Sequence, residues 1–235
     1  MKKTRVLAKK AVPQRKSVSS SWESQPTPLQ PAYAYLTVPL PDSDGPSDSL
    51  LCDPLTGLVA YPSFEAHLIA LLPGLATDGL HLAIGDVDDL RGYITAASAN
   101  DATLFGHLAG NDCMRRVGET TRRWAADYLE FWPFAVCATF GGDEVIVAAS
   151  GRPYDAFIDA LTELVSRIRS TAPRPCSFAS ATTMPMTDNI GNSEDAYRRL
   201  VSRVDKCLFC HKASARDAGS TLAGALVDIG SLELT

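Results

Sequence analysis

Apolar residues recur along this chain in two spacings, and the spacing predicts which segments are helices and which are strands. Apolar positions three and four residues apart are typical of one helix face, whereas short continuous apolar runs are typical of a buried strand. Helical spacing predicts a short first helix after Pro62–Ser63 and further helices over about 102–129, 154–170 and 194–213. Apolar runs predict strands over 81–88, 134–140, 144–149 and 176–183. Gly141–Gly142 indicates a hairpin turn between the second and third strands.

The order of these elements after residue 80 is β-α-β-β-α-β-α, which predicts an α+β fold. This order is typical of the ferredoxin-like (βαββαβ) palm, an antiparallel sheet flanked by helices, and we expect the helices on one face of the sheet. The first strand is central in this topology and antiparallel to the third. Its C-terminal end is therefore expected beside the turn that joins the second and third strands.

Both of these places carry acidic residues. Asp86 and Asp88 stand at the end of the first predicted strand, and Asp143 and Glu144 follow the glycine turn. Four carboxylates at one strand edge repel one another unless a cation or a proton offsets their charge. Hard oxygen ligands favour Mg²⁺ or Mn²⁺. Two such ions can activate a hydroxyl nucleophile and stabilise a pyrophosphate leaving group.

The glycine turn is suited to phosphate. Gly141 and Gly142 have no side chains, so their backbone N–H groups can approach phosphate oxygens closely. Together with the acids, this predicts a palm that polymerises or cyclises nucleotides. The alternative is a solvated acidic loop beside an ordinary hairpin turn. The Asp-x-Asp at the matching strand end favours the nucleotide site.

Charge and composition separate a tail from a domain. The chain has 235 residues, 46% of them hydrophobic, and a net charge of −5. Residues 1–50 carry seven basic and four acidic side chains and are rich in proline and serine, which predicts a flexible basic tail. This tail is either simply solvated or in contact with an anionic partner. We assign residues 51–220 to the domain and 221–235 to a C-terminal strand or tail.

No apolar run is long enough for a transmembrane segment, and no secretory signal is evident, so a cytoplasmic location is expected. Six cysteines are too few for a disulfide scaffold of this length, and free thiols are the default.

Five segments resemble the GGDEF family of diguanylate cyclases and cover about residues 51–220. They match its D-x-L-T-G-L opening, D-I-D site, F-G-H-x-x-G helix start, signature loop and closing pattern: Asp53–Leu58, Asp86–Asp88, Phe105–Gly110, Gly141–Val145 and Asp205–Arg216. Valine replaces the usual phenylalanine of the signature. The resemblance implies a bacterial second-messenger enzyme that condenses two GTP into cyclic di-GMP with release of pyrophosphate.

The resemblance also implies roles for individual residues. Asp86 and Asp143 would bind Mg²⁺ (or Mn²⁺) directly, with help from the Val87 carbonyl. Glu144 would act at the metal or at the 3′-hydroxyl, which makes the three acids the catalytic residues. GTP would be held by Gly141, Gly142, Arg91, Lys212 and Arg216. Each palm would bind one GTP, so catalysis would need a homodimer.

The chain departs from the family at the positions that read the base. More residues lie between Asp86 and Gly106 than is usual, so the first guanine-reading asparagine falls on Asn100 only if the insertion loops out. The second position, usually aspartate, falls on Asn111, with Asp112 one step later. A carboxylate accepts from both N1–H and N2–H₂ of guanine, whereas an amide offers one acceptor and one donor, a pattern that suits adenine.

Two further departures leave the activity open. The family's R-x-x-D inhibitory site falls on Trp132 and Ala135, which cannot bind a cyclic dinucleotide, so no inhibitory site is expected. Thr139 replaces an arginine before the aromatic-Gly-Gly unit. The alternatives to a diguanylate cyclase are an inactive GGDEF module that serves as a nucleotide receptor or protein-interaction scaffold, and a cyclase that makes an adenine-containing dinucleotide.

One motif lies outside this interpretation. Cys207-Leu-Phe-Cys210-His211 matches the C-x-x-C-H pattern of haem attachment, and C-x-x-C alone is typical of redox or zinc chemistry. Haem attachment normally needs export, and no second pair of zinc ligands has suitable spacing. We therefore favour thiols packed in the closing helix.

Overall fold

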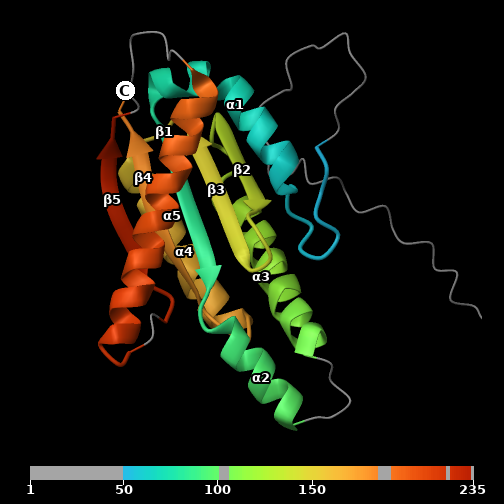
Figure 1. Ribbon diagram of the computed structural model, residues 1–235. Helices are drawn as coiled ribbons and strands as arrows, with labels where there is room; N and C mark the ends of the chain where they lie inside the picture. The colour runs from blue at the N-terminus through green and yellow to red at the C-terminus, as the bar shows by residue number, and fades with distance from the viewer. Residues whose placement is uncertain (1–49, 101–105, 185–191, 221–222, 234–235) are drawn as a thin grey trace, which may run out of the picture.

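A computed structural model of the chain describes residues 50–100, 106–184, 192–220 and 223–233 (Figure 1). The predicted flexible tail, residues 1–50, lies outside the described residues except for Leu50. The strands are β1 (Leu80–Val87), β2 (Phe134–Thr139), β3 (Glu144–Ser150), β4 (Cys176–Thr183) and β5 (Leu226–Leu232). The helices are α1 (Tyr61–Asp78), α2 (Leu90–Asn100), α3 (Gly106–Tyr128), α4 (Tyr154–Thr171) and α5 (Ser193–Asp217).

The strands form one sheet in the order β2-β3-β1-β4-β5. Strand β1 is central and runs antiparallel to both β3 and β4, which confirms the predicted α+β palm. The C-terminal segment supplies β5, which pairs parallel to β4 and makes the sheet mixed. The β1–β3 register places Asp86 directly opposite Glu144.

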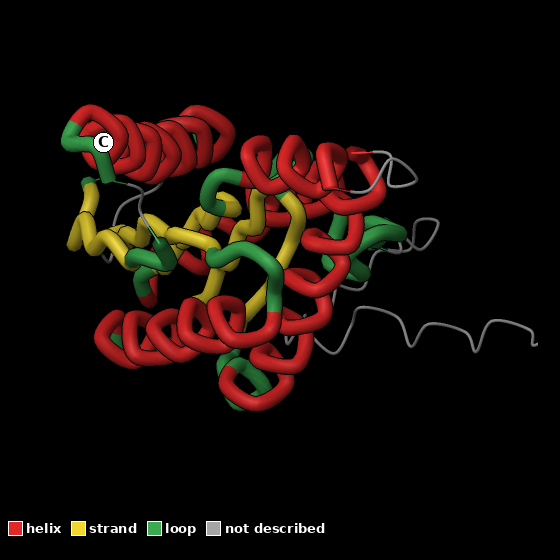
Figure 2. Tube along the Cα trace, turned by 90° about the horizontal axis from the view of Figure 1, so that it is seen from below, coloured by secondary structure: helices red, strands yellow, loops and turns green. Residues whose placement is uncertain are grey.

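Helices cover both faces of the sheet, and the expectation of helices on one face was wrong (Figure 2). The reason is visible in the strands, because nearly every residue of β1, β2 and β4 is buried, so that side chains on both faces need cover. One apolar cluster packs α1 and α5 against the sheet through Phe64, Leu68, Tyr197 and Leu200, among others. The other packs α3 and α4 against the opposite face through Val117, Trp124, Leu161 and Leu164, among others.

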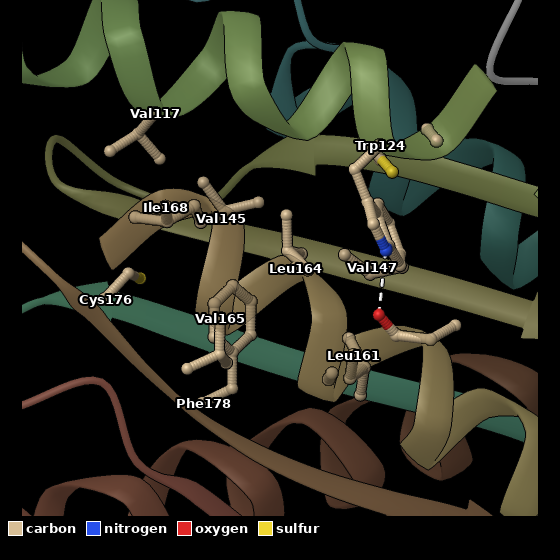
Figure 3. Packing of buried hydrophobic residues seen from close by; sticks show 14 of the residues in the cluster. Val117, Trp124, Val145, Val147, Leu161, Leu164, Val165, Ile168, Cys176 and Phe178 are labelled. Carbon is tan, nitrogen blue, oxygen red and sulfur yellow. Dashed lines mark hydrogen bonds between the residues drawn. The ribbon is translucent and has the colours of Figure 1, made fainter. Parts of the chain in front are cut away.

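The α3–α4 layer is held by a buried aromatic residue (Figure 3). Trp124 is fully buried, and its indole Nε1–H donates a hydrogen bond to the backbone carbonyl of Ala160, 2.8 Å away. A buried indole needs such a partner because an unpaired N–H group inside the protein is costly. This bond fixes the spacing of two helices that carry none of the predicted catalytic residues.

The predicted helix over 102–129 corresponds to α3, and a further helix before it, α2, was not predicted; residues 101–105 between the two helices lie outside the described residues. Helix α2 occupies residues 90–100 of the stretch between Asp86 and Gly106 that holds the insertion. Its apolar residues Leu90, Tyr93, Ile94 and Ala97 do have helical spacing, a weak signal among alanines and serines. Gly110 of α3 accommodates Ile94, because a Cβ at Gly110 would lie 2.9 Å from the Ile94 side chain.

The Asp53–Leu58 segment is a turn fastened to α3. The Asp53 carboxylate accepts hydrogen bonds from both the backbone N–H (2.7 Å) and the hydroxyl (2.6 Å) of Thr56. Gly57 adopts a φ of +70°, a conformation that favours glycine. Gly118 of α3 lets Thr56 approach, since a Cβ there would lie 2.5 Å from the threonine side chain. The motif therefore places the chain that enters α1.

No helix in the part of the chain that the structure describes combines the length and apolar character needed to cross a membrane.

Buried His81 makes the stability of this fold depend on pH. Its Nε2 lies 2.7 Å from the carbonyl of Arg152, and its Nδ1 lies 2.7 Å from the Thr182 hydroxyl. A carbonyl only accepts, so Nε2 carries a proton. Burial lowers the pKa of His81, so the unfolded chain binds a proton more readily than the folded chain.

We therefore expect the free energy of unfolding to fall as the pH drops below about 6.5, with His81 contributing up to about 1 kcal/mol between pH 7.5 and 5.5. Urea unfolding at the two pH values should show a smaller loss for His81→Gln than for the unchanged chain. The exposed His107 offers a control, because His107→Gln should keep the full pH dependence. The same loss in all three proteins would contradict the role of His81.

Candidate functional site

The end of β1 and the β2–β3 turn meet, as the topology predicted. Asp86 faces Glu144 across the β1–β3 ladder, and the Val87 N–H donates a hydrogen bond to the Asp143 carbonyl at 3.1 Å. The backbone thus fixes the two acidic segments side by side. The site lies at the open edge formed by a strand end and a hairpin turn.

The geometry of the β2–β3 turn requires glycine at position 141. The Phe140 N–H donates to the Glu144 carbonyl at 2.9 Å, which closes the hairpin. Gly141 has a φ of +81°, and a Cβ there would lie 2.7 Å from the Glu144 carboxylate oxygen Oε2. A Cβ at Gly142 would meet no atom within 4 Å. Both glycines are exposed, so their backbone is accessible to a ligand.

Lys212 of α5 closes the site on the helix side. Its Nζ lies 3.0 Å from Asp86 Oδ2 and 2.9 Å from Asp88 Oδ1, and it donates to the Asp86 backbone carbonyl at 2.9 Å. Only 15% of the lysine side chain is exposed. The resemblance implied a triphosphate ligand for Lys212, and the structure adds two carboxylate partners.

Asp88 does not join the other acids at the open edge. Its side chain is 3% exposed, and Oδ2 accepts hydrogen bonds from the Ser177 hydroxyl (2.7 Å) and the Gly224 N–H (2.9 Å). The Ser177 oxygen in turn accepts from the Ala225 N–H at 3.0 Å. Asp88 therefore ties β1 to β4 and to the chain entering β5. Sequence reasoning counted it among four converging carboxylates, and this positioning role was missed.

The remaining acids perturb one another. Burial and the negative charges of Asp86, Asp143 and Asp205 raise the pKa of Glu144 to about 7, against a lowering by Lys212. Burial likewise raises the pKa of Asp86, with Lys212 acting in the opposite direction. Asp205 of α5 enters this group although the sequence marked it only as part of the closing motif. Several acids therefore influence one another at this edge, and Lys212 is a cation beside them.

The donor set fits Mg²⁺ or Mn²⁺. Asp86, Asp143 and Glu144 offer hard carboxylate oxygens, and a divalent cation would offset both the burial and the neighbouring acids that raise the pKa values of Asp86 and Glu144. Within the described ranges, no three His, Cys, Asp or Glu side chains are already grouped closely enough to hold a metal. Metal binding would therefore need rotation of the carboxylate side chains. The metal would also share Asp86 with Lys212, which already contacts this carboxylate.

The other predicted substrate residues belong to separate helices. Arg91, in the first turn of α2, Asn111 of α3 and Arg216, near the end of α5, are exposed. Asn100 ends α2, and its side chain lies outside the described part. Asp112, the alternative base reader, is paired with its own helix, since its carboxylate oxygens lie 3.5 Å from Arg115 Nη1 and 3.0 Å from Arg116 Nε.

The positions of the family's inhibitory site are both in the core. Ala135 is fully buried, and Trp132 is 3% exposed and donates from Nε1 to the Tyr128 carbonyl at 3.0 Å. The guanidinium of Arg152 lies over the Trp132 ring at 5.5 Å.

Comparison with known proteins gives the fold a name. No family model matches the chain. An uncharacterized protein in the hutH 5′ region of Streptomyces griseus is 30% identical over 177 residues, which are 73% of this chain and 66% of that protein. The GGDEF domain of DgcB from Caulobacter crescentus, solved with c-di-GMP, superposes with a TM-score of 0.57 at 18% identity, over 81% of this chain and 98% of the domain. The FimX GGDEF domain from Pseudomonas aeruginosa gives 0.54 at 16% identity, over 75% and 98%. The chain has the GGDEF-domain fold.

Removing the Lys212 ammonium should destabilise the fold. Lys212→Met leaves Asp88 buried without its cation, and breaking a buried ion pair in this way costs about 3–5 kcal/mol. Lys206 of the same helix is exposed, so Lys206→Met should change the free energy of unfolding by no more than about 0.5 kcal/mol. Urea unfolding of both variants measures the difference. Equal stabilities would contradict a structural role for the Lys212 contacts.

Proposed function

We propose that this chain, which has the GGDEF-domain fold, is a diguanylate cyclase that condenses two GTP into cyclic di-GMP and releases pyrophosphate. The observation that carries the proposal is the pairing of Asp86 with Glu144 at the edge of the sheet, beside the open Gly141–Gly142 turn. Carboxylates for a cation and accessible backbone for phosphates are what a nucleotidyl transfer needs in one place.

In this proposal Asp86 and Asp143, with the Val87 carbonyl, hold Mg²⁺ or Mn²⁺, and Glu144 acts at the metal or at the 3′-hydroxyl. The metal, when bound, supplies Lewis-acid stabilisation of the charge that develops on the phosphoryl oxygens. Asp86 and Glu144 are fixed by the strand ladder, and Asp143 is fixed through its backbone bond to Val87. The chain thus holds its acids on rigid backbone rather than on a loose loop.

The triphosphate would lie across three elements. The Gly141 and Gly142 amides come from the hairpin, Arg91 comes from α2, and Lys212 and Arg216 come from α5. The exposed Arg91 and Arg216 are accessible to a triphosphate. Before substrate binds, Lys212 offsets the charge of Asp86. One palm offers one such site, so two protomers facing each other as a homodimer would bring the two GTP molecules together.

Asn111 is the base-reading residue that this arrangement favours. Asp112 is engaged by Arg115 and Arg116, whereas Asn111 is exposed on the neighbouring position of α3. An amide pairs less completely with guanine than a carboxylate does, and it suits adenine's donor–acceptor edge. We therefore include a cyclase that accepts ATP as a variant of this proposal.

A catalytically silent nucleotide receptor or scaffold is the second candidate. The observation that favours it is the placement of Lys212, whose ammonium already offsets the charge of one proposed metal ligand, Asp86, at 3.0 Å. An ammonium group offsets one negative charge, but it cannot activate a hydroxyl group as a bound divalent metal does.

Substitution of the proposed metal ligands tests the enzyme. We expect Asp143→Asn and Glu144→Gln each to lower product formation at least about 100-fold, because loss of metal binding removes several kcal/mol of transition-state stabilisation. Purified full-length protein is incubated with Mg²⁺ and labelled GTP, ATP or both, and products are separated by chromatography. Glu130→Gln is the control, because Glu130 is exposed and precedes β2, at the opposite end of that strand from the Gly141–Gly142 turn.

Turnover unchanged in both ligand variants would refute the metal-site assignment. No product from the unchanged chain, with nucleotide binding retained, would establish the receptor or scaffold instead.

A second substitution tests base recognition. Asn111→Asp restores two acceptors toward guanine, so the preference for GTP over ATP should rise about tenfold. Asp112→Asn is the matched control and should leave the preference unchanged, since Asp112 is occupied by the two arginines. Competition between the two labelled nucleotides for product or for binding gives the ratio. A shift caused by Asp112→Asn alone would transfer the reading role to Asp112.

A further inference from the structure

The flank of α5 beside the α1–α5 apolar cluster carries three residues of types that can bind a metal. Cys207, Cys210 and His211 follow the i, i+3, i+4 spacing that brings side chains to one side of a helix. The expectation that these thiols are packed was only partly right. Cys207 is half-buried, but Cys210 and His211 are exposed. No described contact joins the three to the acids of the strand edge.

The separation of two of these ligands matches a metal chelate. Cys207 Sγ lies 3.6 Å from His211 Nδ1. Tetrahedral zinc, with its bonds of about 2.3 Å to sulfur and about 2.0 Å to nitrogen, places these two atoms about 3.5 Å apart. His211 Nδ1 also lies 3.0 Å from the Cys207 carbonyl and donates its N–H there, so a metal at Nδ1 would replace this hydrogen bond and leave the ring proton on Nε2. The separation of the two atoms therefore suits one ion, while binding requires the imidazole to change tautomer.

We propose that Cys207, His211 and Cys210 form a zinc site on the surface of α5. Cys207 and His211 supply the first two ligands in nearly their present positions. Cys210 joins as the third by rotation of its exposed side chain, since no group of three in the described chain is already placed for a metal. Water or a ligand from another molecule completes the tetrahedron.

Zinc is favoured by the ligand chemistry. Thiolate and imidazole select zinc over Mg²⁺ and Mn²⁺, which prefer the carboxylates of the strand edge. The proposed zinc ligands and the residues that contact the strand edge also lie on different sides of α5. Leu208 is buried, and the next position on that inner face, Lys212, contacts Asp86 and Asp88. Zinc can therefore bind on the flank that carries its three ligands while the inner contacts remain intact.

Cobalt substitution provides the test, because Co²⁺ bound to thiolate gives an intense near-ultraviolet charge-transfer band that Co²⁺ bound to carboxylates lacks. The full chain, reduced with a non-chelating phosphine, is titrated with Co²⁺ and then with Zn²⁺ in competition with a chromophoric chelator. We expect one Co²⁺ per chain with the thiolate band, displaced by Zn²⁺. Cys207→Ser and His211→Gln should each weaken Zn²⁺ binding at least about tenfold, as loss of a primary ligand requires.

Matched controls come from the same chain. Cys52→Ser and His107→Gln replace an exposed thiol and an exposed imidazole elsewhere and should leave the band and the affinity unchanged. Asp143→Asn should also leave them unchanged, which separates this site from the proposed catalytic metal. Circular dichroism of each variant establishes that α5 is folded.

Cobalt bound without the thiolate band, or with a band of unchanged intensity in Cys207→Ser, would overturn the proposal. So would Zn²⁺ affinity unaffected by His211→Gln. In either case the 3.6 Å contact would be only a thiol–imidazole hydrogen bond. Loss of the band in Cys210→Ser, with the Cys207–His211 pair intact, would support Cys210 as the third ligand.

Discussion

The Lys212 ammonium lies between the carboxylates of Asp86 and Asp88, and this buried contact joins the last helix to the central strand. Burying these charges is costly unless each finds partners, and here each does. Asp88 also receives the Ser177 hydroxyl and the Gly224 N–H, so one carboxylate links β1, β4, α5 and the chain entering β5. The position of α5 and the placement of the chain that enters β5 therefore both depend on the Asp88 carboxylate.

The two acids of the Asp-x-Asp pair consequently have different roles. Asp88 has its charge satisfied inside the protein, while Asp86 is shared between Lys212 and the open edge. The described part of the chain shows no ion pair for Asp143 or Glu144, and burial together with repulsion from neighbouring acids raises the pKa of Glu144. The fold thus concentrates uncompensated negative charge on one side of Lys212 and neutralises it on the other. A cation or a phosphate-bound metal meets only the first side.

The sequence predicted what depends on topology and local pattern. The strands, the hairpin and the approach of Asp86 to Glu144 follow from element order and from two glycines. Helix α2 was missed because Leu90, Tyr93 and Ile94 are followed by small residues that weaken the helical signal. The inward turn of Asp88 depends on Ser177 and Gly224, and the contribution of Asp205 depends on how α5 packs. Such long-range partners leave no mark in local spacing.

The fifth strand gives the C-terminal segment a mechanical role. Strand β5 pairs with β4 along its length, and the approach to it is fixed where Gly224 meets Asp88. Helix α5 is therefore held at both ends by the sheet, through β4 before it and β5 after it. A fusion partner or peptide that pulled β5 from the sheet edge would act on Asp88 first and on Lys212 next. The edge strand β5 is in this way connected, through Asp88 and Lys212, to the acidic residues at the end of the central strand β1. A partner that bound the C-terminal strand would therefore be able to change the position of those acids.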